Sequence, residues 1–291
     1  MTQYFHYCCK GLKTDLIFAD KREFIAGMNR IGVCYLYCIG EKLPVQIVAF
    51  CLLSNHFHFV LYGTEEAAES FISHYVLLTG KWIRKHRGER LHGKIEIGHW
   101  VARTTEGVRN KMVYTLRQTL EAGLPVTPQG YPWCSAGLMF NDHEFVLSSA
   151  VPVCKYSGRA ALKAFNTKIG LPEDWVVVCG NMIWPGCYTD ISGAQRLFSG
   201  VKDFMYCLNN GNIDKSVSSE MILERPSIPD TELRNRACSL AKGLFGRRGM
   251  GSCPAEERSQ IAALLRKELH CGYKQLARIV MMEEAELRNH I

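Results

Sequence analysis

The sequence predicts an α+β fold, in which helices pack on one face of a largely antiparallel sheet and a mainly helical region follows. Strand-like and helix-like segments alternate in the order strand, helix, strands, helix, strand, helix over about 125 residues from the N-terminus. This order is typical of a compact α+β sandwich. Helical patterns alone follow residue 255, and they predict the helical C-terminal region.

The strand-like segments are rich in apolar residues that alternate or run together, and they cover residues 4–11, 45–54, 56–63 and 94–103. Residues 45–63 form either two strands joined by a polar turn at Ser54 and Asn55 or one long bent strand. Residues 34–40 either continue the helix before them or form a short strand.

The helix-like segments repeat apolar residues every three or four positions, and they cover residues 20–32, 65–87 and 104–123. The last of them is the best marked. Thr104 or Thr105 can serve as its N-cap, Glu106 lies in its first turn, and Gly123 is a typical stop signal.

The bulk composition is that of an ordinary folded protein, with 47% hydrophobic and 22% charged residues in a chain of 291. This length most naturally holds two domains. No apolar run is long enough to span a bilayer, and the start lacks an export signal, so we expect a cytoplasmic protein with no membrane partner. The 13 cysteines are scattered without a C-x-x-C pair, which favours reduced thiols over a structural zinc site.

The positive charge is concentrated in one segment. The chain carries a net charge of +7, and residues 71–120 alone contain ten Lys/Arg against three Asp/Glu, an excess of the same size. A localised basic surface is typical of a phosphate-binding protein such as one that binds nucleic acid. A solvated helix face remains the alternative for the run 81–90.

Three regions follow from these patterns. Residues 1–140 contain the predicted sandwich. Residues 141–250 combine linker-like and helical stretches, and the sequence assigns them no function. Residues 251–291 contain three short helical patterns that fit a helix-turn-helix unit whose last helix would enter a DNA major groove. A plain helical bundle is the alternative.

Two histidines lie at alternate positions of the apolar run 49–63. Successive strand side chains point to opposite faces, so His56 and His58 share one face, beside a hydrophobic core. Taken alone, such a pair is more typical of core or interface residues whose hydrogen bonds are satisfied than of metal ligands.

The helix at 104–123 adds a second polar pair. At 100° per residue its apolar side chains fill one arc, comprising Val108, Met112, Val113, Leu116 and Leu120. Tyr114 and Gln118 fall outside this arc, one turn apart on a common face, with Lys111 on the same side. A phenol and a carboxamide flanked by basic side chains can take part in chemistry, whereas a residue that only packs cannot.

The segment "LLSNHFHFVLYG" resembles the histidine–hydrophobe–histidine motif of HUH endonucleases. It is most similar to that of the single-tyrosine insertion-sequence transposases and their relatives, the REP-associated tyrosine transposases. Further resemblance is carried by "CCKGLKTDLIFADKREF", by "YTLRQTLEAGL" and by "GYPWCS", in the family's order and spacing over residues 3–140. The chain departs from the family at Ser54, where relatives have proline, and at Gln118-Thr119, where many have Asn-Pro.

The resemblance implies a ferredoxin-like HUH endonuclease sandwich that cleaves and rejoins single-stranded DNA through a 5′-phosphotyrosine. It implies Tyr114 as the nucleophile, and His56, His58 and Gln118 as ligands of a divalent ion. Nitrogen and neutral-oxygen donors suit Mg²⁺ or Mn²⁺. The expected partner is single-stranded DNA with hairpin ends. One tyrosine per chain suggests a homodimer when two ends are cut.

The candidates for contacts with the DNA backbone are basic residues of the charged segment, namely Lys81, Arg84, Lys85, Arg87, Arg103, Arg109, Lys111 and Arg117. Trp82 and Trp100 could stack bases, although core packing is the favoured interpretation of both.

Three alternatives stay open. A relaxase or rolling-circle initiator would use the same chemistry, although such proteins often carry two tyrosines or a third histidine, neither evident in these motifs. A non-catalytic DNA-binding regulator could derive from such a transposase. A metal-dependent hydrolase unrelated to DNA would leave the clustered basic charge unexplained.

Overall fold

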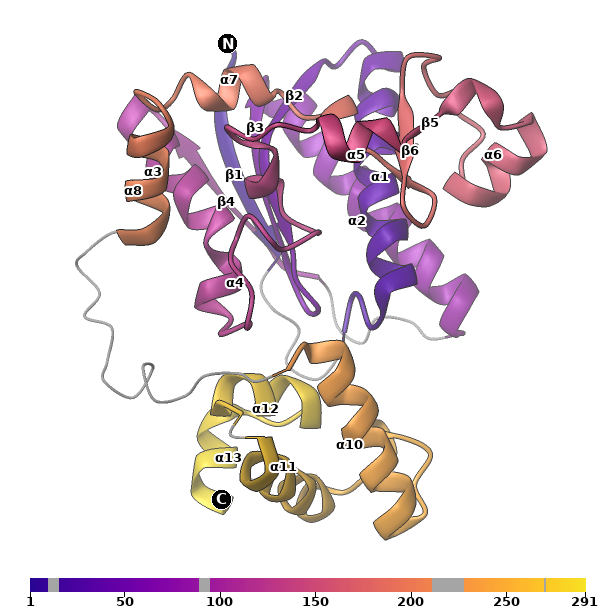
Figure 1. Cartoon of the computed structure of the whole chain (residues 1–291), viewed down its shortest axis with the longest axis vertical. Coiled ribbons are helices and arrows are strands. Elements are labelled where there is room, and N and C mark those ends of the chain that lie inside the picture. The colour runs from indigo at the N-terminus through magenta and orange to yellow at the C-terminus, as the bar shows by residue number, and fades with distance from the viewer. Residues whose placement is uncertain (10–15, 89–94, 211–227, 270) are drawn as a thin grey trace.

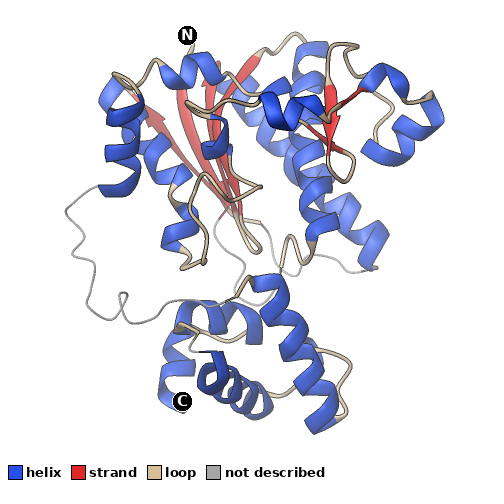
Figure 2. Cartoon of the chain, viewed as in Figure 1, coloured by secondary structure: helices blue, strands red, loops and turns tan. Residues whose placement is uncertain are grey.

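A four-stranded antiparallel sheet forms the centre of the first 102 residues (Figures 1 and 2). The computed structural model describes residues 1–9, 16–88, 95–210, 228–269 and 271–291. The elements of this part are β1 (Gln3–Cys9), α1 (Lys21–Gly40), β2 (Val45–Leu52), β3 (Phe57–Gly63), α2 (Glu65–Arg87) and β4 (Ile97–Ala102). The strand order is β2-β3-β1-β4, and each neighbouring pair is antiparallel. The predicted α+β class with an antiparallel sheet is confirmed.

Helices cover both faces of this sheet, whereas the sequence predicted helices on one face only. One face packs on α1 and α2, and the other on α3 (Thr105–Leu116) and α8 (Val201–Asn210) (Figure 1). The reason lies in the strands, which are apolar on both sides. In β3, Phe57 and Phe59 enter the first core, while Val60 enters the second. A sheet buried on both faces needs two layers of cover.

The predicted helices are present, and the structure resolves the alternatives left by the sequence. Helix α1 continues without interruption through residues 34–40, and the Asp20 side chain caps it by accepting a hydrogen bond from the Glu23 amide. Residues 45–63 form two strands. Helix α2 spans Glu65–Arg87 and ends at Gly88, whose φ of 70° suits glycine.

The helix expected over residues 104–123 is divided in two. Thr104 caps α3 as predicted, with its hydroxyl 3.0 Å from the Gly107 amide. Helix α3 then ends at Leu116, and a short α4 (Gln118–Glu121) follows Arg117. Gly123, with φ of 66°, follows the second piece as the predicted stop.

The segment 131–138 protects the exposed edge of the sheet. Strand β2 is an edge strand, and an unpaired edge is a site of aggregation. The Leu52 amide donates to the Trp133 carbonyl at 2.9 Å, and the Ser135 hydroxyl accepts from the Phe50 amide at 2.9 Å. The short 3₁₀ helix η1 (Ser135–Leu138) follows.

Residues 141–210 add a second, smaller sheet that the sequence did not predict. Its order is β5-β6-β7, formed by β5 (Val151–Pro152), β6 (Val176–Val178) and β7 (Met182–Ile183). It packs on α1, where Asn29 donates to the Asn181 carbonyl and accepts from the Ile183 amide. The other elements are α5 (Glu144–Ser148), η2 (Val153–Lys155), α6 (Gly158–Phe165), η3 (Pro185–Cys187) and α7 (Ile191–Gln195).

The chain ends in a helical unit with its own core, which we call the C-terminal unit (residues 228–291). It contains α10 (Asp230–Phe245), η4 (Met250–Ser252), α11 (Ala255–Leu269), α12 (Tyr273–Val280) and α13 (Glu284–His290). The mainly helical C-terminal region is confirmed. Helix α10 shares this core although it precedes residue 251, and the division into three regions stays a prediction. In the described part of the chain no helix has the length and apolar character needed to cross a membrane.

Candidate functional site

Three imidazoles meet on the α3 side of the central sheet. His58 lies in β3 and His56 in the turn before it, and their ring centroids are 5.2 Å apart. The third is His6 of β1, whose Nε2 lies 3.2 Å from Nδ1 of His58. The sequence predicted His56 and His58 but not His6. The antiparallel register sets Cys8 opposite His58, which makes His6 its diagonal neighbour on the same face.

The ring of Tyr114 lies over these imidazoles. Its centroid is 5.5 Å from that of His58 and 5.7 Å from that of His6, with both rings nearly perpendicular to it. Helix α3 holds it there because Met112 and Leu116 are fully buried against the sheet. Tyr114 itself keeps 43% of its surface exposed, so a large substrate can reach it.

Gln118 connects Tyr114 to His56. Its side chain is 4% exposed, and Nε2 donates to the Tyr114 carbonyl at 3.1 Å. The carboxamide also lies close enough to the His56 imidazole and the Tyr114 phenol to act on the pKa of both. The helix break at Arg117 lies between the two residues, yet they remain on one side of the sheet, where the sequence had placed them.

Burial keeps all three imidazoles neutral. It lowers the pKa of His6 to about 4, with a smaller contribution from the charge of Lys111. Burial likewise lowers the pKa of His56 to about 4, helped by the Arg278 charge, and lowers that of His58 well below its usual range. A neutral imidazole has the lone pair that metal ligation requires.

The hydrogen bonds leave one ring nitrogen of each motif histidine available. Nδ1 of His56 lies 2.8 Å from the Asn55 side-chain oxygen, and Nδ1 of His58 is bonded to His6, so Nε2 is the candidate donor in both rings. Among the described residues, no three His, Cys, Asp or Glu side chains form a group that could hold a metal ion. The amide oxygen of Gln118, which the sequence predicted as the third ligand, would complete a three-donor set beside His56 and His58.

Lys111 and Trp100 border the site on its β4 side. The Lys111 ammonium lies 5.0 Å from the Trp100 ring centroid and 5.5 Å from that of Tyr114. Trp100 pairs with His6 across the strands and is 38% exposed, contrary to the core packing that was expected. Trp82 is buried on α2, as expected.

The other candidate DNA contacts are divided between surface and structural positions. Arg87 forms an ion pair with Glu23, Arg109 pairs with Asp203 at 2.6 Å, and Arg117 donates to the Leu208 carbonyl. The remaining candidates are exposed, namely Lys81, Arg84, Lys85 and Arg103. The first three lie on α2, which covers the sheet face opposite Tyr114. Arg90 of the same run lies outside the described residues.

Comparison with known proteins adds one structural neighbour. No family model matches the chain, and no curated protein matches its sequence. The solved structure described as "Structure of the REP associates tyrosine transposase bound to a REP hairpin" is similar over 47% of this chain and 78% of that one. The TM-score is 0.34 and the sequence identity is 10%.

Proposed function

We propose that the chain is a DNA strand transferase of the single-tyrosine HUH class, which cleaves and rejoins single-stranded DNA with hairpin ends. The observation that carries the proposal is the meeting of four groups: the Tyr114 phenol, the imidazoles of His56 and His58, and the Gln118 carboxamide. The order β1-α1-β2-β3-α2-β4, with sheet order β2-β3-β1-β4, also supports it, because ferredoxin-like sandwiches have this topology.

In this proposal the Tyr114 oxygen attacks the scissile phosphorus. The bond from phosphorus to the 3′ oxygen breaks, the phenol gives up its proton, and the leaving oxygen takes up a proton to become a 3′-hydroxyl. The product is a 5′-phosphotyrosine. A second 3′-hydroxyl can attack this phosphotyrosine in reverse and rejoin the strand without ATP, because the phosphodiester energy is retained.

The chain's own residues contribute position and charge. Burial raises the pKa of Tyr114, although its hydrogen bond to Gln118 acts in the opposite direction, so the resting phenol is protonated at neutral pH. The Lys111 ammonium beside the ring is suitably placed to attract a phosphate.

The donor set fits Mg²⁺ or Mn²⁺, held by His56, His58 and Gln118, because the imidazoles are neutral and the third donor is a neutral oxygen. Such an ion acts as a Lewis acid on a phosphoryl oxygen.

The test of the proposal is covalent attachment to labelled single-stranded DNA carrying a hairpin. Tyr114→Phe is expected to abolish the adduct and leave binding unchanged, because only the nucleophilic oxygen is removed. The matched control is Tyr206→Phe, since Tyr206 is 61% exposed on α8. An adduct of undiminished yield in Tyr114→Phe would show that Tyr114 is not the nucleophile.

A separate test addresses the ion without relying on activity. Titration with Mn²⁺, followed by electron paramagnetic resonance, is expected to show one bound ion per wild-type chain. His56→Ala removes one donor, and we expect a loss of affinity at least as large as the roughly 10–100-fold that follows loss of an outer contact. The control is His290→Ala, at the end of α13. Equal Mn²⁺ affinity in His56→Ala would reject the ligand set.

A second candidate function is favoured by one observation. Relaxases and rolling-circle initiators often carry a third histidine, and His6 lies in hydrogen-bonding contact with His58, although the three imidazoles do not form a group that could hold a metal ion among the described residues. Both candidates form the same phosphotyrosine, and their substrates distinguish them: a transposase rejoins two cleaved ends, whereas a relaxase or initiator nicks one strand. A non-catalytic regulator would bind DNA and form no adduct.

The proposed homodimer can be tested by sedimentation of the DNA complex.

A further inference from the structure

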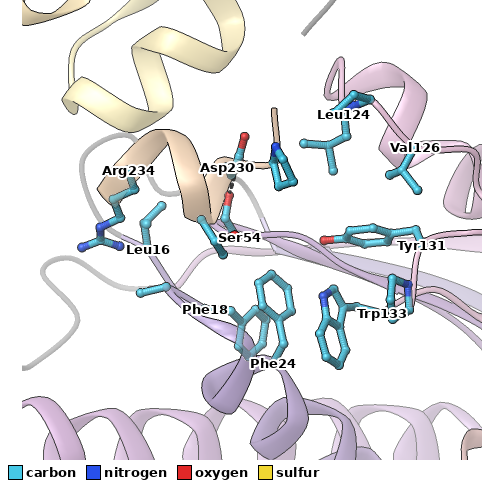
Figure 3. A pocket seen from close by; sticks show the side chains of 15 residues that line it. Leu16, Phe18, Phe24, Ser54, Leu124, Val126, Tyr131, Trp133, Asp230 and Arg234 are labelled. Carbon is cyan, nitrogen blue, oxygen red and sulfur yellow. Dashed lines mark hydrogen bonds between the residues drawn. The ribbon is translucent and has the colours of Figure 1, made fainter. Parts of the chain in front are cut away.

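A pocket of about 230 Å³ lies between the central sheet and the start of α10 (Figure 3). We call it the Trp133 pocket. Its apolar lining comes from segments far apart in sequence: residues 16–24, 124–133 and 229–234. Pro125, Pro132 and Pro229 line it and are exposed, so it is open to solvent. Sites for drug-sized ligands run from roughly 300 to 1,000 Å³. The smaller volume suits one planar ring system.

Four of the fifteen side chains that line the pocket are aromatic. Phe24 and Trp133 stack with ring centroids 5.1 Å apart, and Phe18 packs against Phe24 at 5.0 Å. Tyr131 comes from the adjoining loop, and in Figure 3 its hydroxyl is directed toward Ser54 and Asp230. Such a lining offers broad contact to a flat heterocycle.

The polar atoms of the pocket suit a ring with hydrogen-bonding groups at its edge. The Ser54 hydroxyl and the Asp230 carboxylate lie 3.1 Å apart in its wall. Arg234 also lines the pocket, and its Nη1 is buried without a hydrogen-bond partner among the described residues. A buried, unsatisfied donor is costly.

The pocket adjoins the histidine site through one short turn. Ser54 is two residues from His56, and the turn between them is closed by a hydrogen bond of 2.8 Å from the Leu53 amide to the His56 carbonyl. Arg278 also connects the two sites, because it donates to Asp230 in the pocket wall and its charge acts on the His56 imidazole. A strand whose phosphate lies at His56 would therefore lie near the pocket.

We propose that the Trp133 pocket binds one unpaired nucleobase of the single-stranded substrate, extruded from its neighbours beside the scissile phosphate. The inference rests on the proposed function and deepens it by assigning a base-binding subsite to the junction with α10. Extruded bases are held in this way, by stacking on aromatic side chains and by hydrogen bonds to their edges.

The test is an abasic scan measured in the Tyr114→Phe background, so that the strand stays intact. Oligonucleotides that lack one base at a time are titrated against the protein, and one position is expected to lose affinity on the order of tenfold. Thr231→Phe fills the pocket from the first turn of α10. This variant should bind the complete strand with the affinity lowered by the same factor, and removal of the base at that position should not lower the affinity further.

Asn235→Phe places the same ring on the exposed side of α10 and should retain the wild-type profile. Arg234→Gln removes the charge without adding bulk, and it is measured in parallel in case Thr231→Phe fails to fold. It should reduce the loss of affinity that removal of the base at that position causes. If every abasic oligonucleotide binds equally well while the wild-type protein forms the Tyr114 adduct, the assignment of the pocket as a base-binding subsite is wrong and the proposed function still holds. Absence of both binding and adduct would overturn the proposed function and the pocket together.

Discussion

At the scale of single residues, His6 is the member of the site that could not be predicted from the sequence. The H-x-H pattern is local, and strand alternation predicted that His56 and His58 share a face, although β3 begins only at Phe57 and His56 lies in the turn before it. His6 reaches them from another strand, and that contact depends on the register between β1 and β3. The alternation of "YFHYC" put His6 on the face opposite Phe5 and Tyr7, but nothing local indicated the strand it would pair with.

His6 is predicted to orient His58 through the hydrogen bond to Nδ1. His6→Ala removes that partner, and loss of such an outer contact typically weakens metal binding by about 10–100-fold. His6→Gln keeps a hydrogen-bonding group and should recover part of the loss. Calorimetric titration with Mn²⁺ measures both variants. Equal affinity in wild type and His6→Ala would mean that His6 is only a packing residue.

At the scale of elements, long and strongly patterned segments were predictable. Helix α2 has the predicted bounds, and the Thr104 cap is where the pattern put it. Strands β5, β6 and β7 have two or three residues each, too few to produce a period, and their pairing partners are distant. The break at Arg117 was also missed, because the apolar arc continues across it.

The edge contact of Ser135 is predicted to stabilise β2. Ser135 is fully buried, and Ser135→Ala leaves the Phe50 amide without its partner, at a cost of about 1–3 kcal/mol in the free energy of unfolding. Urea denaturation measures it. Ser73→Ala, on the exposed surface of α2, should change the free energy by less than about 0.5 kcal/mol. A similar small change for Ser135→Ala would contradict the structural role of this bond.

At the scale of the whole molecule, Asp230 joins the C-terminal unit to the histidine turn. Its carboxylate accepts from Ser54 at 3.1 Å, from Gln275 at 3.0 Å and from Arg278 at 3.2 Å. Arg278 also donates to the Ala122 carbonyl at 3.1 Å. The sequence indicated helices at the C-terminal end, but a hydrogen-bonding centre made from three distant segments has no local pattern.

Loss of this junction is predicted to loosen the turn that holds His56. Hydrogen bonds to a charged group contribute about 1.5–3 kcal/mol, so Asp230→Ala should speed amide hydrogen exchange at residues 53–56 by about tenfold or more. Glu232→Ala is the control, since its carboxylate pairs with Arg236 on the exposed side of α10. Unchanged exchange in Asp230→Ala would show that the turn is stable without the C-terminal unit.

The central claim is that the Tyr114 oxygen becomes joined to the 5′ phosphate of a cleaved strand. The most direct measurement digests the covalent complex with protease and nuclease and sequences the modified peptide by mass spectrometry. The account predicts a phosphate-linked nucleotide on Tyr114 and a free 3′-hydroxyl on the released fragment. Cleavage with no modified peptide, or with the nucleotide on another residue, would contradict it.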